Sequence, residues 1–578
     1  MLAAMPPSPS IRPQGAEPPI RDRGDACPGA LRLHSAADGH LARVRLPAGD
    51  LTVRQAEALA DAADRLGDGH LSLTSRGNAE LRGLPDGCGD RLAVLLRDAG
   101  LLPSERHERV RNILASPLAG LDRHTPSDVR LWARELDGLL CASESATALS
   151  GRFLFVLDDG RGDVAALGGD VSLVAERGGV GAPMGDGELS GAGDQPGYGG
   201  LPGAGDLPGA GDLPGAGDLP RYGCPAGSGG TALLRVGDDP AALRIAGPDA
   251  PRAALTAAEA FLTAAEASGS GAWRVRELPV GHGLTARAVA ERLRAAGIGC
   301  AEVAGAVAAG AAGAGTAHVG GSADVTGTTD VTGTADVTGT ADVTGTADAT
   351  GAPTPASAPY AESIPDAASV PFTPSVPYAG SVPPPASVPY ADSSAPGVIE
   401  GTDGARALSV LAPLGRLSVA QWRLLTSVAA EDGAGALRLT PWRGVVIPGL
   451  SADTAVPRLR ELSTAGLITD PDSPWHRIGA CTGRPGCAKS RTDVRADASA
   501  AVTAGTPVPG EPGQQPALRR LPVYWSGCER RCGHPHGAWV DVLATPEGYR
   551  VSVVQPQSTP APHPAPAAPS AAPCPTTS

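Results

Sequence analysis

Four cysteines near the end of the chain are the residues of this sequence best suited to chemistry. They form two pairs, Cys481-Thr-Gly-Arg-Pro-Gly-Cys487 and Cys528-Glu-Arg-Arg-Cys532. Two close pairs on separate loops can bring four soft thiolates together, which is the donor set of an iron-sulfur cluster. Structural zinc sites commonly leave about two to four residues between paired cysteines. The five residues inside the first pair therefore favour a cluster, with zinc as the alternative.

Composition excludes several other classes of protein. The 578 residues include 78 Gly and 57 Pro, so much of the chain is not packed core. A net charge of -14 argues against a nucleic-acid partner. Neither the Pro/Ser-rich N-terminus nor the Ala/Gly-rich run near residues 301–317 resembles a signal peptide or a membrane span. We expect a cytoplasmic protein without a membrane partner, where disulfides are disfavoured.

An internal repeat organises the chain around these cysteines. Adding 366 to the residue number maps 12 of the 34 residues from Leu51 to Leu84 onto identical residues from Leu417 to Leu450, without a gap. The identities follow a strand, helix and strand in order, whereas shared composition alone would scatter them. The sequence therefore predicts a duplication.

Continued beyond the repeat, the same offset compares the region of the cysteines with the first copy. It places Arg111 opposite Arg477 and Ala115 opposite Cys481. Because only the second half has the cysteines, we expect the two halves to close over one shared site.

The elements that must position this site alternate between strand and helix patterns. In the first copy we expect strands at residues 30–34, 41–46, 70–74 and 80–84, and helices at 53–66, capped by Thr52, and 90–98. Between the copies we expect strands at 231–236 and 241–245, and helices at 251–267 and 285–296. This pattern indicates an α+β protein.

The duplication and the cysteine motif together resemble the sulfite and nitrite reductase superfamily, as does the turn Leu73-Thr-Ser-Arg-Gly-Asn78. The resemblance implies an internally duplicated α+β fold with two ferredoxin-like half-domains and two α/β domains. It also implies that the four cysteines bind a 4Fe-4S cluster, and that Cys532 bridges to the iron of sirohaem where sirohaem is present.

This resemblance divides the chain into predicted parts, in which repetitive segments bury too little apolar surface to fold. The parts are a disordered N-terminus (1–25), a first half-domain (26–105), a first α/β domain (106–300) with a low-complexity insert at about 180–228, a disordered linker (301–397), a second half-domain (398–470), a cluster-bearing α/β domain (471–556) and a disordered tail (557–578).

Within the superfamily, the sequence most resembles the precorrin-3B synthases of aerobic cobalamin synthesis. The resemblance is carried by Arg23-Gly-Asp-Ala-Cys-Pro-Gly-Ala-Leu-Arg32, the turn at Arg76, and Ser526-Gly-Cys-Glu-Arg-Arg-Cys-Gly-His-Pro535. It implies an oxygen-dependent monooxygenase that hydroxylates precorrin-3A and closes a lactone. The implied cofactors are the 4Fe-4S cluster and either sirohaem or a non-haem iron. The implied partners are precorrin-3A, dioxygen and an electron donor such as ferredoxin or an NAD(P)H-linked reductase.

Arginines are the expected contacts for such a ligand, because tetrapyrroles of this pathway carry many carboxylates and Arg binds carboxylates bidentately. The resemblance marks Arg76, Arg111 and Arg152 as candidate catalytic residues. It marks Arg443 and Arg477 as cofactor-binding residues beside the four cysteines.

One departure from the superfamily bears on the reaction. Sulfite reductases have a Lys-x-Lys that binds the anion and delivers protons, whereas this chain has Arg152 and Leu154 at those positions. Losing a proton-donating charge argues against a six-electron reduction of sulfite.

Two other functions stay open at this point. One is a sirohaem-dependent nitrite or sulfite reductase, and the other is a non-catalytic protein that binds a cluster or a tetrapyrrole. We interpret Cys27 as a buried structural thiol. His534 and His536 either donate hydrogen bonds near the cluster or pack their loop.

Overall fold

The structure is a computed structural model that describes residue 25 and residues 27–122, 129–176, 230–303, 395–401, 404–509, 521–535 and 537–555. These residues belong to one compact unit of the chain, Met1–Ala311 together with Val376–Ser578. The predicted low-complexity segments and disordered tails fall almost wholly outside the described residues. Within the described ranges, no helix has both the length and the apolar character that crossing a bilayer requires.

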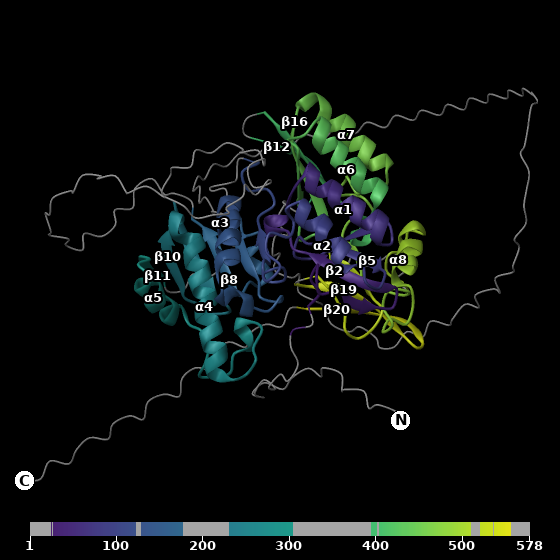
Figure 1. The fold of residues 1–578 in the computed structure, drawn as a ribbon. Helices are drawn as coiled ribbons and strands as arrows, with labels where there is room; N and C mark the ends of the chain where they lie inside the picture. The colour runs from purple at the N-terminus through teal and green to yellow at the C-terminus, as the bar shows by residue number, and fades with distance from the viewer. Residues whose placement is uncertain are drawn as a thin grey trace, which may run out of the picture. The chain divides into compact units, whose positions relative to one another are not determined.

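Two half-domains repeat the same order of elements (Figure 1). The first contains β1 (His34–Ala36), β2 (Gly39–Val44), η1 (Pro47–Gly49), β3 (Asp50–Thr52), α1 (Val53–Leu66), β4 (His70–Leu73), β5 (Ala79–Leu84) and α2 (Gly89–Asp98). The second contains β12 (Gly397–Glu400), β13 (Arg406–Leu411), η7 (Pro413–Gly415), β14 (Arg416–Ser418), α6 (Val419–Glu431), β15 (Ala436–Leu439), β16 (Gly444–Leu450) and α7 (Ala452–Thr464). The predicted duplication is therefore present as structure.

The two half-domains exchange one short strand each. Their sheets run β1-β2-β5-β4-β14 and β12-β13-β16-β15-β3, so β14 extends the first sheet and β3 extends the second. Leu417 pairs with Leu71, and in the mirrored contact Leu51 pairs with Leu437. One continuous hydrophobic core spans both sheets and their helices. Neither half can complete its sheet alone, because each depends on the other for an edge strand.

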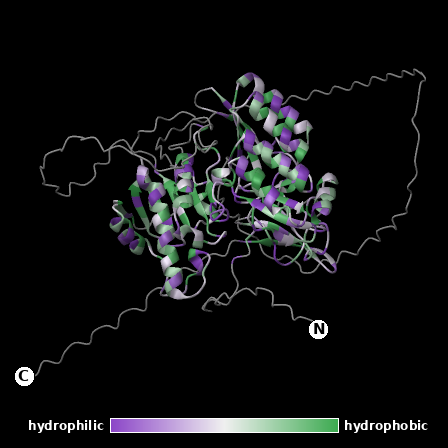
Figure 2. Ribbon diagram, viewed as in Figure 1, coloured by the Kyte–Doolittle hydropathy of each residue, from purple (hydrophilic) through white to green (hydrophobic). Residues whose placement is uncertain are grey.

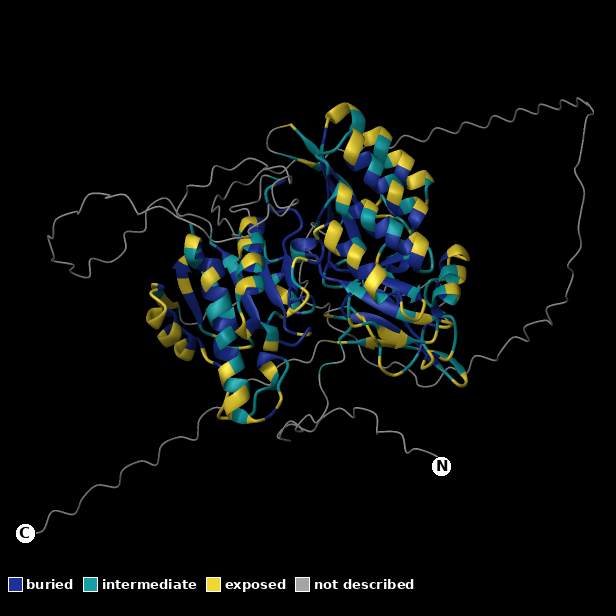
Figure 3. Cartoon of the chain, in the orientation of Figure 1, coloured by how far each residue is buried: buried dark blue, intermediate teal, exposed yellow. Residues whose placement is uncertain are grey.

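The helices α1 and α6 begin in the same way because their sequences encode the same cap. Thr52 and Gln55 form a reciprocal capping box at the start of α1, and Ser418 and Gln421 form its counterpart at α6. The two helices pack against each other, and the Trp422 indole donates a hydrogen bond of 2.8 Å to the Ala56 carbonyl. Apolar and polar residues alternate around the helices (Figure 2), and the faces turned to the sheets are buried (Figure 3).

Two α/β domains complete the described fold. The first contains β6 (Ile113–Ala115), α3 (Val129–Ala142), η2 (Ser145–Ala148), β7 (Phe155–Asp158), η3 (Ala165–Leu167), β8 (Val171–Ala175), β9 (Thr231–Val236), β10 (Ala242–Ala246), η4 (Gly247–Asp249), α4 (Ala250–Ser268), η5 (Val275–Glu277), α5 (Ala286–Ala295) and β11 (Cys300–Val303). The second contains β17 (Ile478–Ala480), α8 (Val494–Thr503), β18 (Val523–Ser526), β19 (Trp539–Thr545) and β20 (Gly548–Val554). Both begin with three parallel strands, β6-β7-β8 and β17-β18-β19.

Most predicted elements lie within two residues of their observed positions, with one exception. The strand expected at residues 30–34 is wrong, since β1 starts only at His34. The backbone amides of Ala30, Leu31 and Arg32 instead donate to the buried carboxylate of Glu108, at 2.7, 2.6 and 3.3 Å. A backbone whose donors point at one carboxylate cannot also pair as a strand.

The offset of the repeat changes by one residue before the α/β domains. Phe155 donates its amide to the Asn112 carbonyl, and Val523 donates to the Arg477 carbonyl in the equivalent contact. The structural counterpart of Arg477 is therefore Asn112, and Arg111 is not its partner. One residue fewer in the loop before β17 explains the slip, which sequence identity alone did not reveal.

Candidate cluster site and anion-binding cavity

The four cysteines lie in the two loops that leave β17 and β18. Cys481 directly follows β17, where its amide donates to the Trp525 carbonyl at 2.9 Å. The first loop folds back because the Cys487 amide donates to the Gly483 carbonyl at 2.8 Å. Cys528 and Cys532 lie in the turn that follows β18. Adjacent parallel strands end at the same edge of a sheet, so the two loops come together there.

The four thiols share one environment. Burial, followed by the neighbouring Cys528 and Cys481 thiolates, raises the pKa of Cys532. Burial also raises the pKa of Cys481, and its neighbours Cys528 and Cys487 add to the shift. The Gly527 amide donates to the Cys481 sulfur at 3.2 Å. Four thiols that disfavour one another's negative charge are suited to a cationic metal centre that would neutralise them.

The spacing of the sulfurs separates a cluster from a single zinc ion. Around one tetrahedral zinc, ligand sulfurs lie about 3.8 Å apart. No three of these four sulfurs, all of them in described residues, lie within 4.8 Å of one another. A four-iron cluster carries one ligand on each iron and so holds its sulfurs further apart. As they stand, the four thiols are thus too far apart for one zinc ion, and their two pairs supply the four soft ligands that a 4Fe-4S cluster needs.

Each cysteine loop is held by an arginine from a different half-domain. Arg82 on β5 donates to the Gly486 carbonyl at 2.7 Å, next to Cys487. Arg443 in the second half-domain donates to the Gly533 carbonyl at 2.8 Å, next to Cys532. The cluster site thus depends on both copies of the repeat, although its cysteines come from one.

A cavity of about 600 Å³ opens beside the cysteines. Cys481 and Cys532 form part of its wall, together with residues of both half-domains and of both α/β domains. Arginines dominate its charged lining, and they are Arg43, Arg45, Arg76, Arg152, Arg274, Arg276, Arg443 and Arg495. Its acidic lining residues are Glu80 and Glu277. The cavity therefore has a strong excess of positive charge inside an acidic protein.

Several of these arginines have no carboxylate neighbour to neutralise them. Within the described part of the chain, no carboxylate lies at salt-bridge distance from Arg45, Arg76, Arg443 or Arg495. Burial, and then the charges of Arg43 and Arg76, lower the pKa of Arg45 to about 9. Burial lowers the pKa of Arg76 and of Arg495 to about 10, with neighbouring arginines adding to both shifts. Charges that the protein leaves uncompensated in a cavity favour an anionic ligand.

Comparison with known proteins agrees with this architecture. The sequence profile of the nitrite/sulfite reductase ferredoxin-like half domain matches residues 34–88 and 399–465. Both copies of the repeat therefore match one and the same half-domain profile. The first matched segment covers β1 to β5 with α1, and the second covers part of β12 and all of β13 to α7, so the duplication predicted from the offset and the expected α+β fold class are confirmed.

Two curated proteins are similar in sequence to part of this chain. The chain is 36% identical to a precorrin-3B synthase of Sinorhizobium sp over 154 residues, which is 26% of this chain and 33% of that protein. It is 35% identical to a ferredoxin--nitrite reductase of Synechococcus elongatus over 127 residues, or 21% of this chain and 25% of that protein. The matched region thus spans a third or less of these relatives.

A solved structure supports the same fold. The structure of the Mycobacterium tuberculosis NirA protein aligns with a TM-score of 0.50 and 14% identity, covering 89% of this chain and 74% of that one. The identity is too low to carry function, so the likeness is one of fold alone.

The structure brings together some of the arginines marked from the sequence and separates others. Arg76, Arg152 and Arg443 line the cavity with Cys481 and Cys532. Arg76 donates to the Arg152 carbonyl at 3.3 Å, and the Arg152 guanidinium stacks 4.7 Å from the Trp273 ring.

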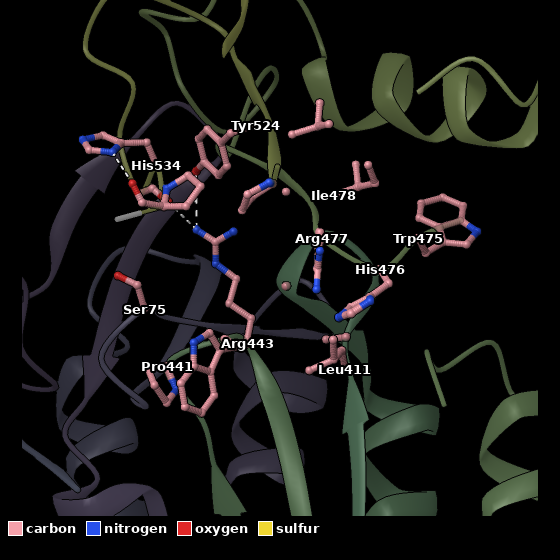
Figure 4. Close-up of a pocket in the computed structure, with 18 of the residues that line it drawn as sticks. Ser75, Leu411, Pro441, Arg443, Trp475, His476, Arg477, Ile478, Tyr524 and His534 are labelled. Carbon is pink, nitrogen blue, oxygen red and sulfur yellow. Dashed lines mark hydrogen bonds between the residues drawn. The ribbon is translucent and has the colours of Figure 1, made fainter. Parts of the chain in front are cut away.

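Arg111 and Arg477 lie outside the cavity wall. Arg111 is buried against α3, where its Nε and Nη2 donate to the Asp137 carboxylate at 2.6 and 2.7 Å. Arg477 lines a smaller pocket of about 150 Å³, with Trp475, Leu411 and Ile478 (Figure 4). The two pockets meet at Arg443 and Tyr524, which line both.

The sequence interpretation missed several residues of the cavity. Cys27, which we expected to be a buried structural thiol, is only half-buried and lines the cavity. Arg45 is buried between the apolar residues Val44 and Leu46, and a charge inside an apolar run was the available signal. Arg274 directly precedes η5 and Arg495 lies in α8, and nothing in the sequence linked those segments to the site.

His534 takes a packing position. Its ring stacks on Trp539 with a centroid distance of 5.3 Å and an interplanar angle of 9°, and Nδ1 lies 2.8 Å from the Pro535 carbonyl oxygen. His536 lies outside the described residues.

Proposed function

We propose that this protein is an iron-sulfur oxidoreductase of the precorrin-3B synthase type, which uses an oxygen-dependent reaction to hydroxylate a polycarboxylate tetrapyrrole. One observation carries the proposal: a single cavity has two of the four cluster thiols in its wall and eight arginines around it. The thiols supply a site for electron delivery, and the arginines suit a ligand that carries many carboxylates.

The size of the cavity supports one macrocycle as its occupant. Ligand pockets of roughly 300–1,000 Å³ hold one organic ligand of drug or cofactor size. The cavity, at about 600 Å³, has room for one tetrapyrrole beside the cysteines. If the substrate is itself the macrocycle, it occupies the space in which a reductase holds sirohaem.

The residues of the chain would bind and orient this substrate. Arg45, Arg76 and Arg495 have no carboxylate partner in the described structure, so the carboxylates of the ligand would supply the counter-charge that these arginines lack. Arg152, stacked on Trp273, provides a charged wall from the first α/β domain. Fixing several carboxylates at once holds the macrocycle in one orientation against the Cys532 turn and excludes water from that face.

Cys481, Cys487, Cys528 and Cys532 would hold the cluster, which would pass single electrons into the cavity from an external ferredoxin or NAD(P)H-linked donor. In the overall reaction, one atom of dioxygen enters the product as a hydroxyl group. The other atom leaves as water, using two electrons and two protons from outside the substrate. A carboxylate oxygen of the neighbouring acetate then bonds to an adjacent ring carbon while the acetate proton moves to the macrocycle, so the lactone closes by addition, without a leaving group or further electrons.

Isotope labelling tests this reaction directly. The purified protein with a reconstituted cluster is incubated with precorrin-3A, a reductant and ¹⁸O₂, and the product is analysed by mass spectrometry. We expect one labelled oxygen in a lactone product. Turnover without label in the product would contradict the monooxygenase assignment.

The second candidate is a sirohaem-dependent nitrite reductase, favoured by the similarity to ferredoxin--nitrite reductases. Against it, Leu154 is buried in an apolar cluster with Leu114 and Val156 and presents no charge to the cavity. A stoichiometric sirohaem band in the visible spectrum of anaerobically purified protein, with dye-driven reduction of nitrite, would establish this candidate in place of the synthase.

A further inference from the structure

Arg443 makes direct contacts with the turn that carries Cys532. Its Nη2 donates to the Gly533 carbonyl at 2.8 Å and to the Tyr524 hydroxyl at 3.4 Å. The Tyr524 hydroxyl in turn donates to the Cys532 carbonyl at 2.6 Å. The guanidinium also lies 5.4 Å from the centroid of the Tyr524 ring, which it faces in Figure 4. Two consecutive carbonyls of the cluster turn are therefore held by one arginine and one tyrosine.

The backbone around Arg443 is shaped to admit this side chain. A Cβ on Gly415 would collide with the Cδ atom of Arg443, and one on Gly479 would lie 3.1 Å from its Nη1. A Cβ on Gly533 would lie 3.0 Å from its Nη2. Three glycines on three separate segments thus leave a passage that the arginine fills, which indicates a built position.

Arg443 also adopts a backbone conformation that is unfavourable for a side chain. Its φ is 61°, in the left-handed region, and its counterpart in the first half-domain is Gly77 with φ 66°. Glycine adopts this conformation freely, whereas another L-residue loses on the order of 1 kcal/mol. Strain of this kind persists when the surrounding contacts hold the residue in place, often at functional sites. The second half-domain therefore accepts strain at a turn where the first half-domain avoids it.

The charge of Arg443 is not neutralised within the described structure. No carboxylate of the described residues lies at salt-bridge distance, and its hydrogen-bond acceptors are carbonyl and hydroxyl oxygens. Arg443 lines the large cavity and also the smaller pocket beside it. A ligand carboxylate in the cavity and a cluster held by Cys532 would therefore share this one cation.

We propose that Arg443 is a positioning residue that fixes the Cys532 turn and couples anion binding in the cavity to the reduction potential of the cluster. The proposal rests on the proposed function, since it uses both the cluster and the anionic ligand. A cation beside the cluster stabilises the reduced state, which carries one more negative charge. A ligand carboxylate that pairs with Arg443 cancels part of this effect and makes the potential more negative. By linkage, reducing the cluster weakens anion binding by the same factor.

The test compares two variants that differ in where they act. Arg443→Gly removes the side chain and restores the residue of the first half-domain, so it also relieves the left-handed backbone and should fold. Ala48→Gly is the matched control, because Ala48 has φ 58° and lines neither pocket. The cluster of each full-length protein is reconstituted, and its midpoint potential is measured by an EPR-monitored redox titration, with and without uroporphyrin, a porphyrin octacarboxylate.

We expect three results for Arg443→Gly relative to the wild type and to Ala48→Gly. The midpoint potential without ligand is more negative, uroporphyrin shifts it less, and the Kd for uroporphyrin increases about tenfold, as for one charged hydrogen bond. Arg443→Lys retains the charge and should give a smaller change in potential. If Arg443→Gly alone fails to retain the cluster, Arg443→Lys supplies the potential measurement and the positioning role is supported.

The outcomes also separate this inference from the proposed function. Equal potentials and equal ligand shifts in Arg443→Gly and the wild type would overturn the coupling. A wild-type protein that binds no iron at the cysteines would overturn both proposals. A wild-type protein that holds the cluster and binds uroporphyrin but does not convert precorrin-3A would overturn only the proposed reaction, because these measurements do not depend on turnover.

Discussion

The two halves of the chain carry different reactive groups at the ends of their first parallel strands, carboxylates in the first half and thiols in the second. After β6 and β7 come Ser116 and a loop of buried carboxylates, and after β17 and β18 come the cysteine loops. The frame is the same, since Ser116 donates its amide to the Leu157 carbonyl at 3.0 Å as Cys481 does to the Trp525 carbonyl at 2.9 Å. The buried carboxylates are Asp158, Asp159 and Asp163, whose oxygens lie within 4.8 Å of one another.

The first half holds most of its carboxylate oxygens with its own donors, although Asp163 Oδ2 is buried without a hydrogen-bond partner. Arg161 bonds Asp159 at 2.9 Å and Asp122 at 2.9 Å, and Ser116 donates to Asp163 at 2.6 Å. Among the described residues no arginine or lysine donates a hydrogen bond to the thiols of the second half, and burial, together with repulsion from neighbouring thiolates, raises the pKa of Cys481 and Cys532. The same fold thus carries a hydrogen-bonded aspartate triad, Asp158, Asp159 and Asp163, in one half and the four cysteines of the proposed cluster site in the other.

Replacing a cysteine should have the largest effect on the difference between the two halves, because it removes a proposed cluster ligand. Cys532→Ser should eliminate the reconstituted cluster and all turnover, because a hydroxyl is a poor ligand for iron in place of a thiolate. Iron and sulfide analysis with the visible spectrum measures the loss. As a control, Ser116→Cys places a thiol at the equivalent position of the first half and should bind no additional iron. A Cys532→Ser protein with a full cluster would show that the ligand assignment is wrong.

Breaking the Arg111 ion pair should cost stability and leave the cavity intact. Arg111→Met leaves the Asp137 carboxylate without its partner, and losing one member of a buried pair lowers the free energy of unfolding by about 3 kcal/mol. Urea denaturation measures the change. The double variant Arg111→Met/Asp137→Asn should recover part of it. If Arg111→Met instead weakened uroporphyrin binding at unchanged stability, Arg111 would belong to the ligand site.

Arg76 should show the reverse pattern. Its guanidinium faces the cavity without a carboxylate partner, so Arg76→Ala should raise the Kd for uroporphyrin by about tenfold to a hundredfold, or about 1.4–2.8 kcal/mol. The unfolding free energy should hardly change. Arg106, whose guanidinium pairs with Glu144 outside the cavity, provides the control variant Arg106→Ala. Equal affinities of the Arg76 and Arg106 variants would remove the case for a carboxylate contact at Arg76. Fluorescence titration measures both constants.

Local structure was largely readable from the sequence. The helix at Val53–Leu66 was found at its observed bounds, since amphipathic spacing and the Thr52 cap are local signals. The strand exchange between half-domains was not foreseen, because β3 and β14 pair with strands distant in sequence. The sequence also did not predict the one-residue change in the repeat offset before Arg477, because only the pairing of the strands reveals it.

The site was readable where residues form a compact motif. The residue type and spacing of the two cysteine pairs predict a metal-binding site, and Arg76 lies in a recognisable turn. Arg45, Arg274 and Arg495 reach the cavity from β2–η1, η5 and α8, so their convergence is a property of the fold. Arg111 was expected at the site but forms a buried ion pair with Asp137 instead. Neither residue alone indicates this pair in the sequence.

The smallest effect should sharpen the contrast between the two strand-end sites. Burial, and then the Asp158 charge, raise the pKa of Asp163 to about 7 from its ordinary value of 3.8. A raised pKa means that the folded state holds a proton that the unfolded state has released. The resulting stability is complete below about pH 4 and is lost as the pH rises through about 7. Between about pH 6 and pH 8 the loss is about 1 kcal/mol.

Asp163→Asn should remove this dependence, since an amide does not titrate and still accepts the Ser116 hydrogen bond through its oxygen. Urea denaturation of the wild type and the variant at both pH values measures how the free energy of unfolding depends on pH. The cysteine loops of both proteins are kept free of metal, so that the two proteins differ only in the aspartate triad. An identical pH dependence in the variant would mean that Asp163 is ionised throughout and that Arg161 balances all three carboxylates. A weaker pH dependence in the variant would show that a shared proton, as well as the Arg161 guanidinium, neutralises the three carboxylates of the first half.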